Sequence, residues 1–208
     1  MRLTIHSRIE PVGQGSIPGK VGYNPDIKLY PYDPARARAL LAEAGYADGL
    51  TLEAAVEIGL AQSMYLKAAQ DLARIGITLN VRAVVAAEWL RKYFSADLGR
   101  VDVLSLVWES GAYRDTIRSI ETYSCAKTNP LFCDQSLIPD INAMGAIFDL
   151  PARDRAHQHI MAKMHYLAPA LFLFNHANST VAHTYVENIV LTERGLAFEK
   201  MKIRGKSP

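Results

Sequence analysis

The sequence predicts an α/β fold, because strand and helix signals alternate along the chain between residues 50 and 108. Residues 50–58 and 77–85 read as strands, and each is followed by a segment with helical periodicity. Residues 101–108 are mostly apolar, which is typical of a central strand covered on both faces. Since strand and helix alternate, we expect the strands to run parallel in a sheet that is flanked by helices.

The composition is that of a folded globular chain with a real core. Half of the 208 residues are hydrophobic, and 23 basic side chains stand against 21 acidic ones. A chain of this length buries about 70% of its extended surface, so it needs neither metal nor disulfide to form a core. The balanced charge argues against a nucleic-acid partner. The longest apolar stretch, residues 166–174, is about half of what a membrane helix needs.

The first helix is predicted from Asp33 to Ala44. Asp33 is a good N-cap, Pro34 suits the first helical position, and Gly45 is a natural stop. A second helix is expected over residues 62–75, and Gly76 ends it. The strand that follows alternates apolar and polar side chains over residues 77–85, so one face is apolar.

A third helix is expected over residues 87–98, with Trp89, Leu90, Tyr93 and Phe94 together on one side. Polar residues 109–135 then read as a long loop. Two further helices are expected, over 137–148 and over 152–167, and the second has Asp149 and Pro151 at its start. The other expected elements are a short buried strand over 170–174, an extended N-terminal linker and an irregular extended tail over 180–203.

Catalytic motifs are scarce, so we expect no enzyme and no cofactor. The glycine-rich stretch 13–21 fits neither the phosphate-binding loop nor the dinucleotide fingerprint, and no nucleophile elbow occurs. His157, His159 and His165 fall on one predicted helix, where His157 and His159 diverge by about 200°. We therefore expect solvated histidines there and no metal site.

Cys125 and Cys133 are the only cysteines, and they stand in a polar, turn-rich stretch. No histidine lies near them in sequence to complete a metal site, so the pair favours a disulfide and an oxidising compartment. Two free thiols are the alternative.

The candidate ligand site follows the strand 101–108. Ligands of open α/β sheets bind beyond the carboxyl ends of strands, and Trp108 ends this one. Glu109, Tyr113, Arg114 and Asp115 come next and could hold a polar or zwitterionic ligand by stacking and charge-assisted hydrogen bonds. The alternative is that Trp108 belongs to the core and that the charges are solvated.

Residues 32–46, YDPARARALLAEAGY, resemble a signature of the family 5 extracellular solute-binding proteins, the dipeptide-, oligopeptide- and nickel-binding components of bacterial ABC importers. Further segments resemble the same family in the same order, namely residues 72–79, 101–108, 125–141 and 152–173. The resemblance spans nearly the whole chain, and it implies one lobe of a class II periplasmic-binding-protein-like fold with a mixed sheet. It also implies that Cys125 pairs with Cys133.

Family members are more than twice this long, so the resemblance implies a C-terminal part. The expected divisions are an N-terminal segment of residues 1–29, a ligand-binding lobe of 30–174 and a tail of 175–208 that returns to the missing lobe. In the family, a strand-end Trp lines the cleft and a following Asp meets the ligand's amino group. Trp108 matches the first, and Asp115 is the nearest match to the second, although the run before it departs from the family pattern.

The predicted function is therefore capture of a peptide or other small polar solute in the periplasm, for an ABC permease in the inner membrane. Binding by this chain alone should be weak or absent, because ligand is trapped between two lobes in this family. The exposed half-cleft around Trp108 and Tyr113 predicts self-association. The alternative is a stand-alone cytosolic α/β domain that senses a metabolite or binds a partner protein.

Overall fold

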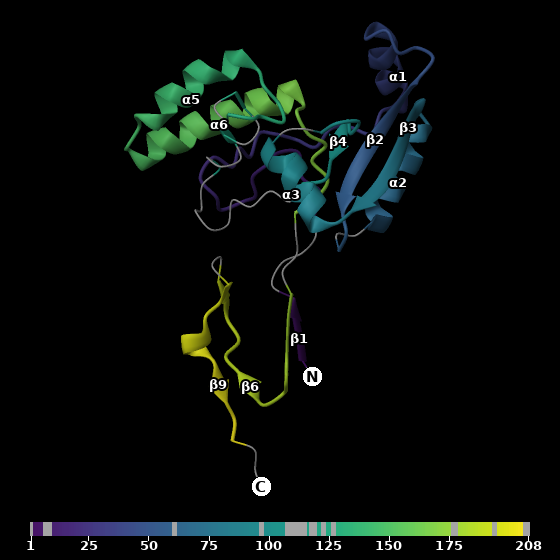
Figure 1. The fold of residues 1–208 in the computed structure, drawn as a ribbon. Coiled ribbons are helices and arrows are strands. Elements are labelled where there is room, and N and C mark those ends of the chain that lie inside the picture. Colours follow the sequence, from purple (N-terminus) through teal and green to yellow (C-terminus); the bar gives the residue numbers. More distant parts are fainter. Residues whose placement is uncertain are drawn as a thin grey trace. The chain divides into compact units, whose positions relative to one another are not determined.

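The chain divides into two compact units in the computed structural model (Figure 1). Unit 1 consists of Met1–Leu29, Trp108–Lys127 and Phe132–Pro208. Unit 2 consists of Tyr30–Val107 and Thr128–Leu131. The residues that the structure describes are 2–5, 10–59, 62–95, 98–106, 116, 120–121, 124–125, 128–175, 179–192 and 195–205. Within these ranges, every helix is too short or too polar to cross a membrane.

Unit 2 is built on a parallel sheet, as the sequence predicts. Its strands are β2 (Leu50–Glu57), β3 (Ile77–Val84) and β4 (Val103–Leu104), in the order β3-β2-β4. Leu50 lies opposite Ile77 in β3, and Ala54 lies opposite Val103 in β4. Four buried side chains form the centre of this sheet: Ala54, Ala55, Val56 and Val84.

Three helices accompany the sheet: α1 (Pro34–Glu43), α2 (Gln62–Ala73) and α3 (Ala86–Ser95). The cap predicted at Asp33 is confirmed, because its Oδ1 accepts a hydrogen bond of 2.9 Å from the backbone N–H of Arg36. In Figure 1, α2 lies along β3, while α3 contacts β2. The predicted alternation of strand and helix is therefore confirmed over residues 50–104.

Two expectations for unit 2 were wrong in detail. Among the described residues, β2 is the central strand and β4 pairs only with β2, over two residues. The mostly apolar composition of 101–108 therefore does not make β4 the central strand of this sheet. The family resemblance also implied a mixed sheet, whereas the described strands of this sheet are all parallel. Helix α3 is described up to Ser95, where it buries Lys92, and the indole N–H of Trp89 donates to the carbonyl of Ser105.

Unit 1 is centred on a helical hairpin. The 3₁₀ turn η2 (Gln135–Leu137) leads directly into α5 (Ile138–Gly145), and α6 (Leu150–Leu167) packs beside α5 (Figure 1). Asp149 caps α6 by accepting the backbone N–H of Ala152 at 2.9 Å, as its position in the sequence predicts. The buried side chains of the hairpin are Leu137, Ile141, Met144, Ile160, Met161 and Met164.

The segment predicted as an N-terminal linker packs against α6 through polar contacts. The side chain of Gln14 pairs with the backbone of Asn24, at 2.7 Å to its carbonyl and 3.0 Å from its N–H. The N–H of Gly22 donates to Asp154, and the amide of Asn24 donates to the carbonyl of Gln158 at 3.2 Å. These contacts fix the path of residues 14–24 along the helix.

The histidines of α6 differ from the solvated arrangement that we expected. His159 is exposed, but His157 is fully buried and the Nδ1 of His165 lies 2.7 Å from the carbonyl oxygen of Gly13. The expectation was wrong for His157 and His165, because the N-terminal segment covers the side of α6 on which they lie. The periodicity of the α6 sequence alone does not show that another segment packs on this side of the helix.

The short buried strand expected over residues 170–174 is absent from that described stretch. Only Phe174 makes an isolated bridge, to Pro11, and Leu171 is 65% exposed. An apolar stretch forms a β-strand only where a neighbouring strand pairs with it through backbone hydrogen bonds. Pro11 lacks the N–H group that would continue such pairing beyond the bridge to Phe174.

The C-terminal tail is mostly extended, and its short strands pair in antiparallel fashion. Strand β1 (Arg2–Ile5) pairs with β5 (Ser179–Ala182), β6 (Val186–Glu187) with β9 (Lys202–Ile203), and β7 (Leu191–Thr192) with β8 (Gly195–Leu196). A 3₁₀ turn, η3 (Phe198–Lys200), precedes β9. The predicted extended tail thus gains only brief pairing.

Candidate functional site

The candidate site is the edge of unit 2 where the parallel strands end. Because β2, β3 and β4 run in the same direction, their carboxyl ends meet at one edge of the sheet. Ile58 follows β2 and donates its N–H to the carbonyl of Val84 at 2.9 Å, and Val85 follows β3. The side chains of Ile58 and Val85 are 61% and 58% exposed, so this edge presents apolar surface.

Ser105, directly after β4, joins three elements at this edge. Its N–H donates to the carbonyl of Ala55 at 3.0 Å, and its hydroxyl accepts the N–H of Glu57 at 3.2 Å. Its carbonyl accepts the indole N–H of Trp89, from α3, at 2.7 Å. Ser105 is buried, so these bonds fix the point from which the chain leaves the sheet.

Tyr65 of α2 also reaches Ser105. Partial burial raises the pKa of the Tyr65 phenol, and its hydrogen bond with the side chain of Ser105 opposes that rise. The sequence analysis missed Ser105 and Tyr65. The available signal was a serine inside an otherwise apolar run, since a buried hydroxyl needs partners.

Helix α3 contributes a rigid aromatic pair. The rings of Trp89 and Tyr93 stack with centroids 5.1 Å apart and planes inclined by 8°. Lys92 is buried beside them, and its ammonium donates to the carbonyl of Leu98 at 2.9 Å. The Lys92 hydrogen bond joins α3 to the loop that leads into β4.

The five residues predicted to touch ligand, Trp108, Glu109, Tyr113, Arg114 and Asp115, lie outside the described residues. The structure does describe the chain up to Leu106, at the carboxyl end of β4. Trp108 comes two residues later in the sequence. Their role as ligand contacts stays a prediction.

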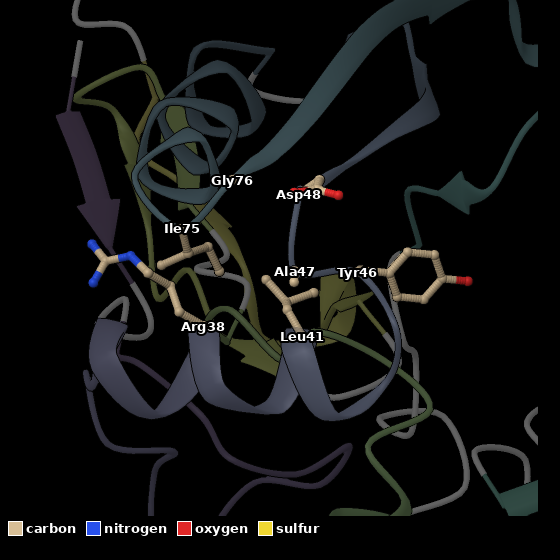
Figure 2. Close-up of a pocket in the computed structure, with 8 residues that line it drawn as sticks. Arg38, Leu41, Tyr46, Ala47, Asp48, Ile75 and Gly76 are labelled. Carbon is tan, nitrogen blue, oxygen red and sulfur yellow. The ribbon is translucent and has the colours of Figure 1, made fainter.

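A pocket of about 230 Å³ lies at the opposite, amino edge of the same sheet (Figure 2). It is bounded by the ends of α1 and α2 and by the turns that enter β2 and β3, and its lining consists of Arg38, Leu41, Tyr46, Ala47, Asp48, Gly49, Ile75 and Gly76. The guanidinium of Arg38 donates to the carbonyl of Arg74 at 3.0 Å, just past the end of α2. That contact joins α1 to the end of α2.

Unit 1 has an open pocket of about 430 Å³ along α6, lined mainly by apolar surface between His159 and Leu167. Lys163, which lines the pocket, forms an ion pair with Asp140, and the Nε2 of His159 lies 3.8 Å from the same carboxylate. Across the described ranges, no cluster of three or more His, Cys, Asp or Glu could hold a metal ion.

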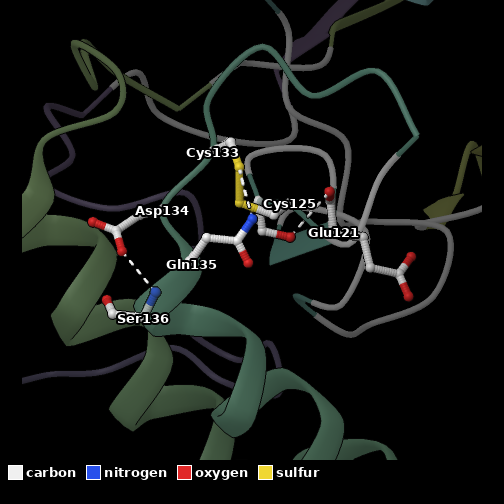
Figure 3. Close-up of a disulfide and its surroundings, with 7 residues drawn as sticks. Glu121, Cys125, Cys133, Asp134, Gln135 and Ser136 are labelled. Atoms are coloured by element: carbon white, nitrogen blue, oxygen red, sulfur yellow. Dashed lines mark hydrogen bonds between the residues drawn. A yellow bond between two sulfur atoms is a disulfide. The ribbon is translucent and has the colours of Figure 1, made fainter.

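Cys125 and Cys133 form a disulfide, so the free-thiol alternative is wrong (Figure 3). Asp134, next to Cys133, caps η2 by accepting the N–H of Ser136 at 2.8 Å. Hydrogen bonds from Ser136 hold the pKa of Asp134 below its usual value. The disulfide therefore sits directly before a capped turn that leads into α5.

Comparison with known proteins places the chain in a family. The profile of the "Bacterial extracellular solute-binding proteins, family 5 Middle" matches residues 8–129. The Glutathione-binding protein GsiB of Salmonella typhi is 40% identical over 76 residues, which are 36% of this chain and 15% of that protein. GsiB of Escherichia coli (strain K12) is 38% identical over 76 residues, with the same coverage.

Solved structures share the fold at low sequence identity. HbpA2 from Haemophilus parasuis has a TM-score of 0.78 at 19% identity, covering 95% of this chain and 40% of that one. The Escherichia coli murein tripeptide binding protein MppA has a TM-score of 0.79 at 14% identity, and the match covers 95% of this chain and 40% of MppA. The dipeptide binding protein from Pseudoalteromonas sp. SM9913, solved with Met-Leu, has a TM-score of 0.75 at 18% identity, and the match covers 93% of this chain and 40% of that protein.

The chain thus spans about two fifths of the length of these solved proteins. Their similarity confirms the predicted fold class, an α/β lobe of the periplasmic-binding-protein type. The family profile covers more than half of the chain and includes the predicted signature at residues 32–46. The protein belongs to the bacterial extracellular solute-binding proteins of family 5.

Proposed function

We propose that this chain captures a small polar solute in the periplasm and passes it to the permease of an ABC importer, without catalysing a reaction. The observation that carries the proposal is the match of the family 5 profile to residues 8–129. The Cys125–Cys133 disulfide supports it, because disulfides persist in the oxidising periplasm and are rare in the cytosol. The alternative, a cytosolic sensor domain, receives no such support.

The solute would be held by the side chains that come after β4 in the sequence. Trp108 and Tyr113 would stack on apolar parts of the solute, while Glu109 and Asp115 would accept hydrogen bonds from an amino group. Arg114 would bind a carboxylate. Ser105 supports this assignment, since its three bonds fix the chain immediately before these residues.

A solute with both an amino group and a carboxylate fits this set of side chains. The relatives that carry ligand names agree with that chemistry: GsiB is a glutathione-binding protein, and the Pseudoalteromonas protein was solved with the dipeptide Met-Leu. AgaA from A. tumefaciens R10, 22% identical to this chain, was solved with agropinic acid. Glutathione and Met-Leu are therefore the first probes.

The proposed domains have the boundaries predicted from the sequence: an N-terminal segment of residues 1–29, a ligand-binding lobe of residues 30–174 and a tail of residues 175–208. The chain would act as the C-terminal part of a two-lobed protein whose lobes close on the solute. One lobe makes about half of the contacts, so this chain alone should bind glutathione or Met-Leu with a Kd of about 1 mM or weaker.

Isothermal titration of the chain with each probe tests this proposal. Trp108→Ala should weaken binding at least tenfold, because it removes the principal stacking surface, whereas Phe148→Ala should leave binding unchanged. Phe148 is an exposed aromatic in the loop between α5 and α6, so it is a matched control. A micromolar Kd, or equal binding by Trp108→Ala and the parent chain, would contradict the proposal.

Self-association through the carboxyl edge is a second consequence of the proposal. The edge exposes the apolar side chains of Ile58 and Val85. Apolar surface of this kind drives association when nothing covers it. Sedimentation velocity should show a concentration-dependent dimer, and Ile58→Thr should weaken it. Leu40→Thr, at an exposed position on α1, is the control. A monomer at about 0.5 mM, or equal effects of the two variants, would count against this interface.

A further inference from the structure

An open pocket of about 430 Å³ lies along α6 in unit 1, and the proposed solute capture does not use it. Helix α6 contributes His159, Ala162, Lys163 and Tyr166 to the lining, since residues three or four apart share one face of a helix. Ser136 lines the pocket from η2, directly before α5. All lining residues belong to one continuous stretch of unit 1, so the pocket is formed within that unit.

The size and the lining of this pocket suit a small organic molecule with an apolar body. Cavities that hold such molecules measure about 300–1,000 Å³ and are mostly apolar, with a few polar groups that fix the orientation. Ala162, Tyr166 and Leu167 supply the apolar part of the lining here. The side chain of Tyr166 is 88% exposed, so its ring is available to stack on a bound molecule.

Two bases beside the pocket share one carboxylate, that of Asp140 in α5. The ammonium of Lys163 donates to this carboxylate at 2.5 Å, and the Nε2 of His159 lies 3.8 Å from the same oxygen. When both bases are protonated, one positive charge in this cluster of three has no counter-charge within it. An anion bound in the pocket would supply that counter-charge.

Two more charged side chains lie nearby on the same elements, and their charges offset each other. Asp134 is the N-cap of η2; hydrogen bonds from Ser136 hold the pKa of its carboxyl below the usual value, and the charge of Lys163 adds to this effect. Arg155 is exposed and precedes His159 by about one turn of α6. The preference for an anion therefore depends on the cluster of three.

We propose that this pocket is a second ligand site, which binds a small carboxylic acid with an aromatic or aliphatic body. The carboxylate of the ligand accepts hydrogen bonds from Lys163 and from protonated His159. Its body lies against Ala162, Tyr166 and Leu167 and is removed from water there. The site is separate from the proposed solute capture and does not rest on it.

Amide chemical shifts of the whole chain, followed during a titration with phenylacetate at about pH 6, test this site. The amides of Ala162, Lys163, Tyr166 and Leu167 should shift with a Kd of about 1 mM, a strength usual for a small ligand in an open pocket. Benzylammonium has the same ring with the opposite charge, and acetate has the charge without the ring. Each should bind about tenfold more weakly or less. Equal binding of the three probes, or no saturable shift up to about 10 mM phenylacetate, would overturn the proposal.

Ala162→Phe provides a variant that fills the pocket and leaves every charge in place. It should abolish the shift of the Leu167 amide with phenylacetate, because the added ring occupies the space of the ligand. Ala143→Phe is the matched control: Ala143 is exposed on α5 and is not one of the described lining residues. It should bind phenylacetate like the parent chain. The same Kd in Ala162→Phe and in the parent chain would overturn the proposal.

The pH dependence of binding tests the part assigned to His159. Imidazole groups ordinarily take up a proton between about pH 8 and pH 5, so phenylacetate should bind about threefold to tenfold more tightly at the lower pH. His159→Gln has no charge to gain and should bind with a Kd that does not change over this range. An equal pH dependence in His159→Gln and the parent chain would overturn the role of His159. None of these outcomes depends on whether glutathione or Met-Leu binds.

Discussion

Replacing Gly49 by alanine is expected to destabilise the chain by about 4 kcal/mol, the largest effect that we expect of a single methyl group. Gly49 has φ of +87°, where an L side chain is strained by roughly 1–2 kcal/mol. Its added Cβ would also lie 2.3 Å from the carbonyl oxygen of Gly76. That oxygen accepts the N–H of Leu50 at 3.1 Å, so the clash falls on the first bond between β2 and β3.

Urea unfolding followed by circular dichroism measures this loss, and amide exchange in β2 and β3 locates it. Gly45→Ala is a matched control, because Gly45 has φ of +88° with nothing within 4 Å of an added Cβ. Gly45→Ala should lower the free energy of unfolding only by the backbone strain, about 1 kcal/mol. Equal losses in the two variants would mean that the close approach of Gly49 to Gly76 is not real.

Gly22→Ala should destabilise unit 1 by about 3 kcal/mol. Gly22 has φ of +84°, and an added Cβ would lie 2.3 Å from the hydroxyl oxygen of Thr116 and 2.6 Å from the Cβ of His157. Thr116 and His157 are both fully buried, so neither can move aside cheaply. The N–H of Gly22 would also be displaced from Asp154.

Exchange of the α6 amides should rise in Gly22→Ala, since the segment 14–24 covers that helix. Gly19→Ala provides the comparison, because Gly19 has φ of +85° and open space around it. We expect about 1 kcal/mol for that variant from backbone strain alone. A Gly22→Ala chain as stable as Gly19→Ala would show that residues 14–24 do not pack on α6 as described.

The elements that the sequence predicted well are those with local signals. Asp33 with Pro34 and Asp149 with Pro151 mark helix starts by their own chemistry, and both caps form. The alternation of apolar and polar residues in 77–85 likewise marks β3. The ordered family motifs predicted the fold class, which the solved relatives confirm.

The errors arose where a distant partner decides the outcome. His157 and Leu171 are examples: the first is buried because residues 14–24 cover α6, and the second is exposed because no ladder forms at 170–174. In the candidate site, the role of Ser105 depends on Glu57, Tyr65 and Trp89, which come from three different elements. The serine in a mostly apolar run indicates a buried hydroxyl, but no local pattern indicates which distant residues it meets.

The location of the bound solute tests the central claim most directly. We would follow the amide chemical shifts of the chain while adding glutathione, and separately Met-Leu, to about 10 mM, enough to populate a millimolar complex. The account predicts shifts at Ile58, Val85 and Leu106, at the carboxyl edge of the sheet, in fast exchange. Shifts confined to Asp48, Gly49 and Gly76, at the amino edge, would contradict it.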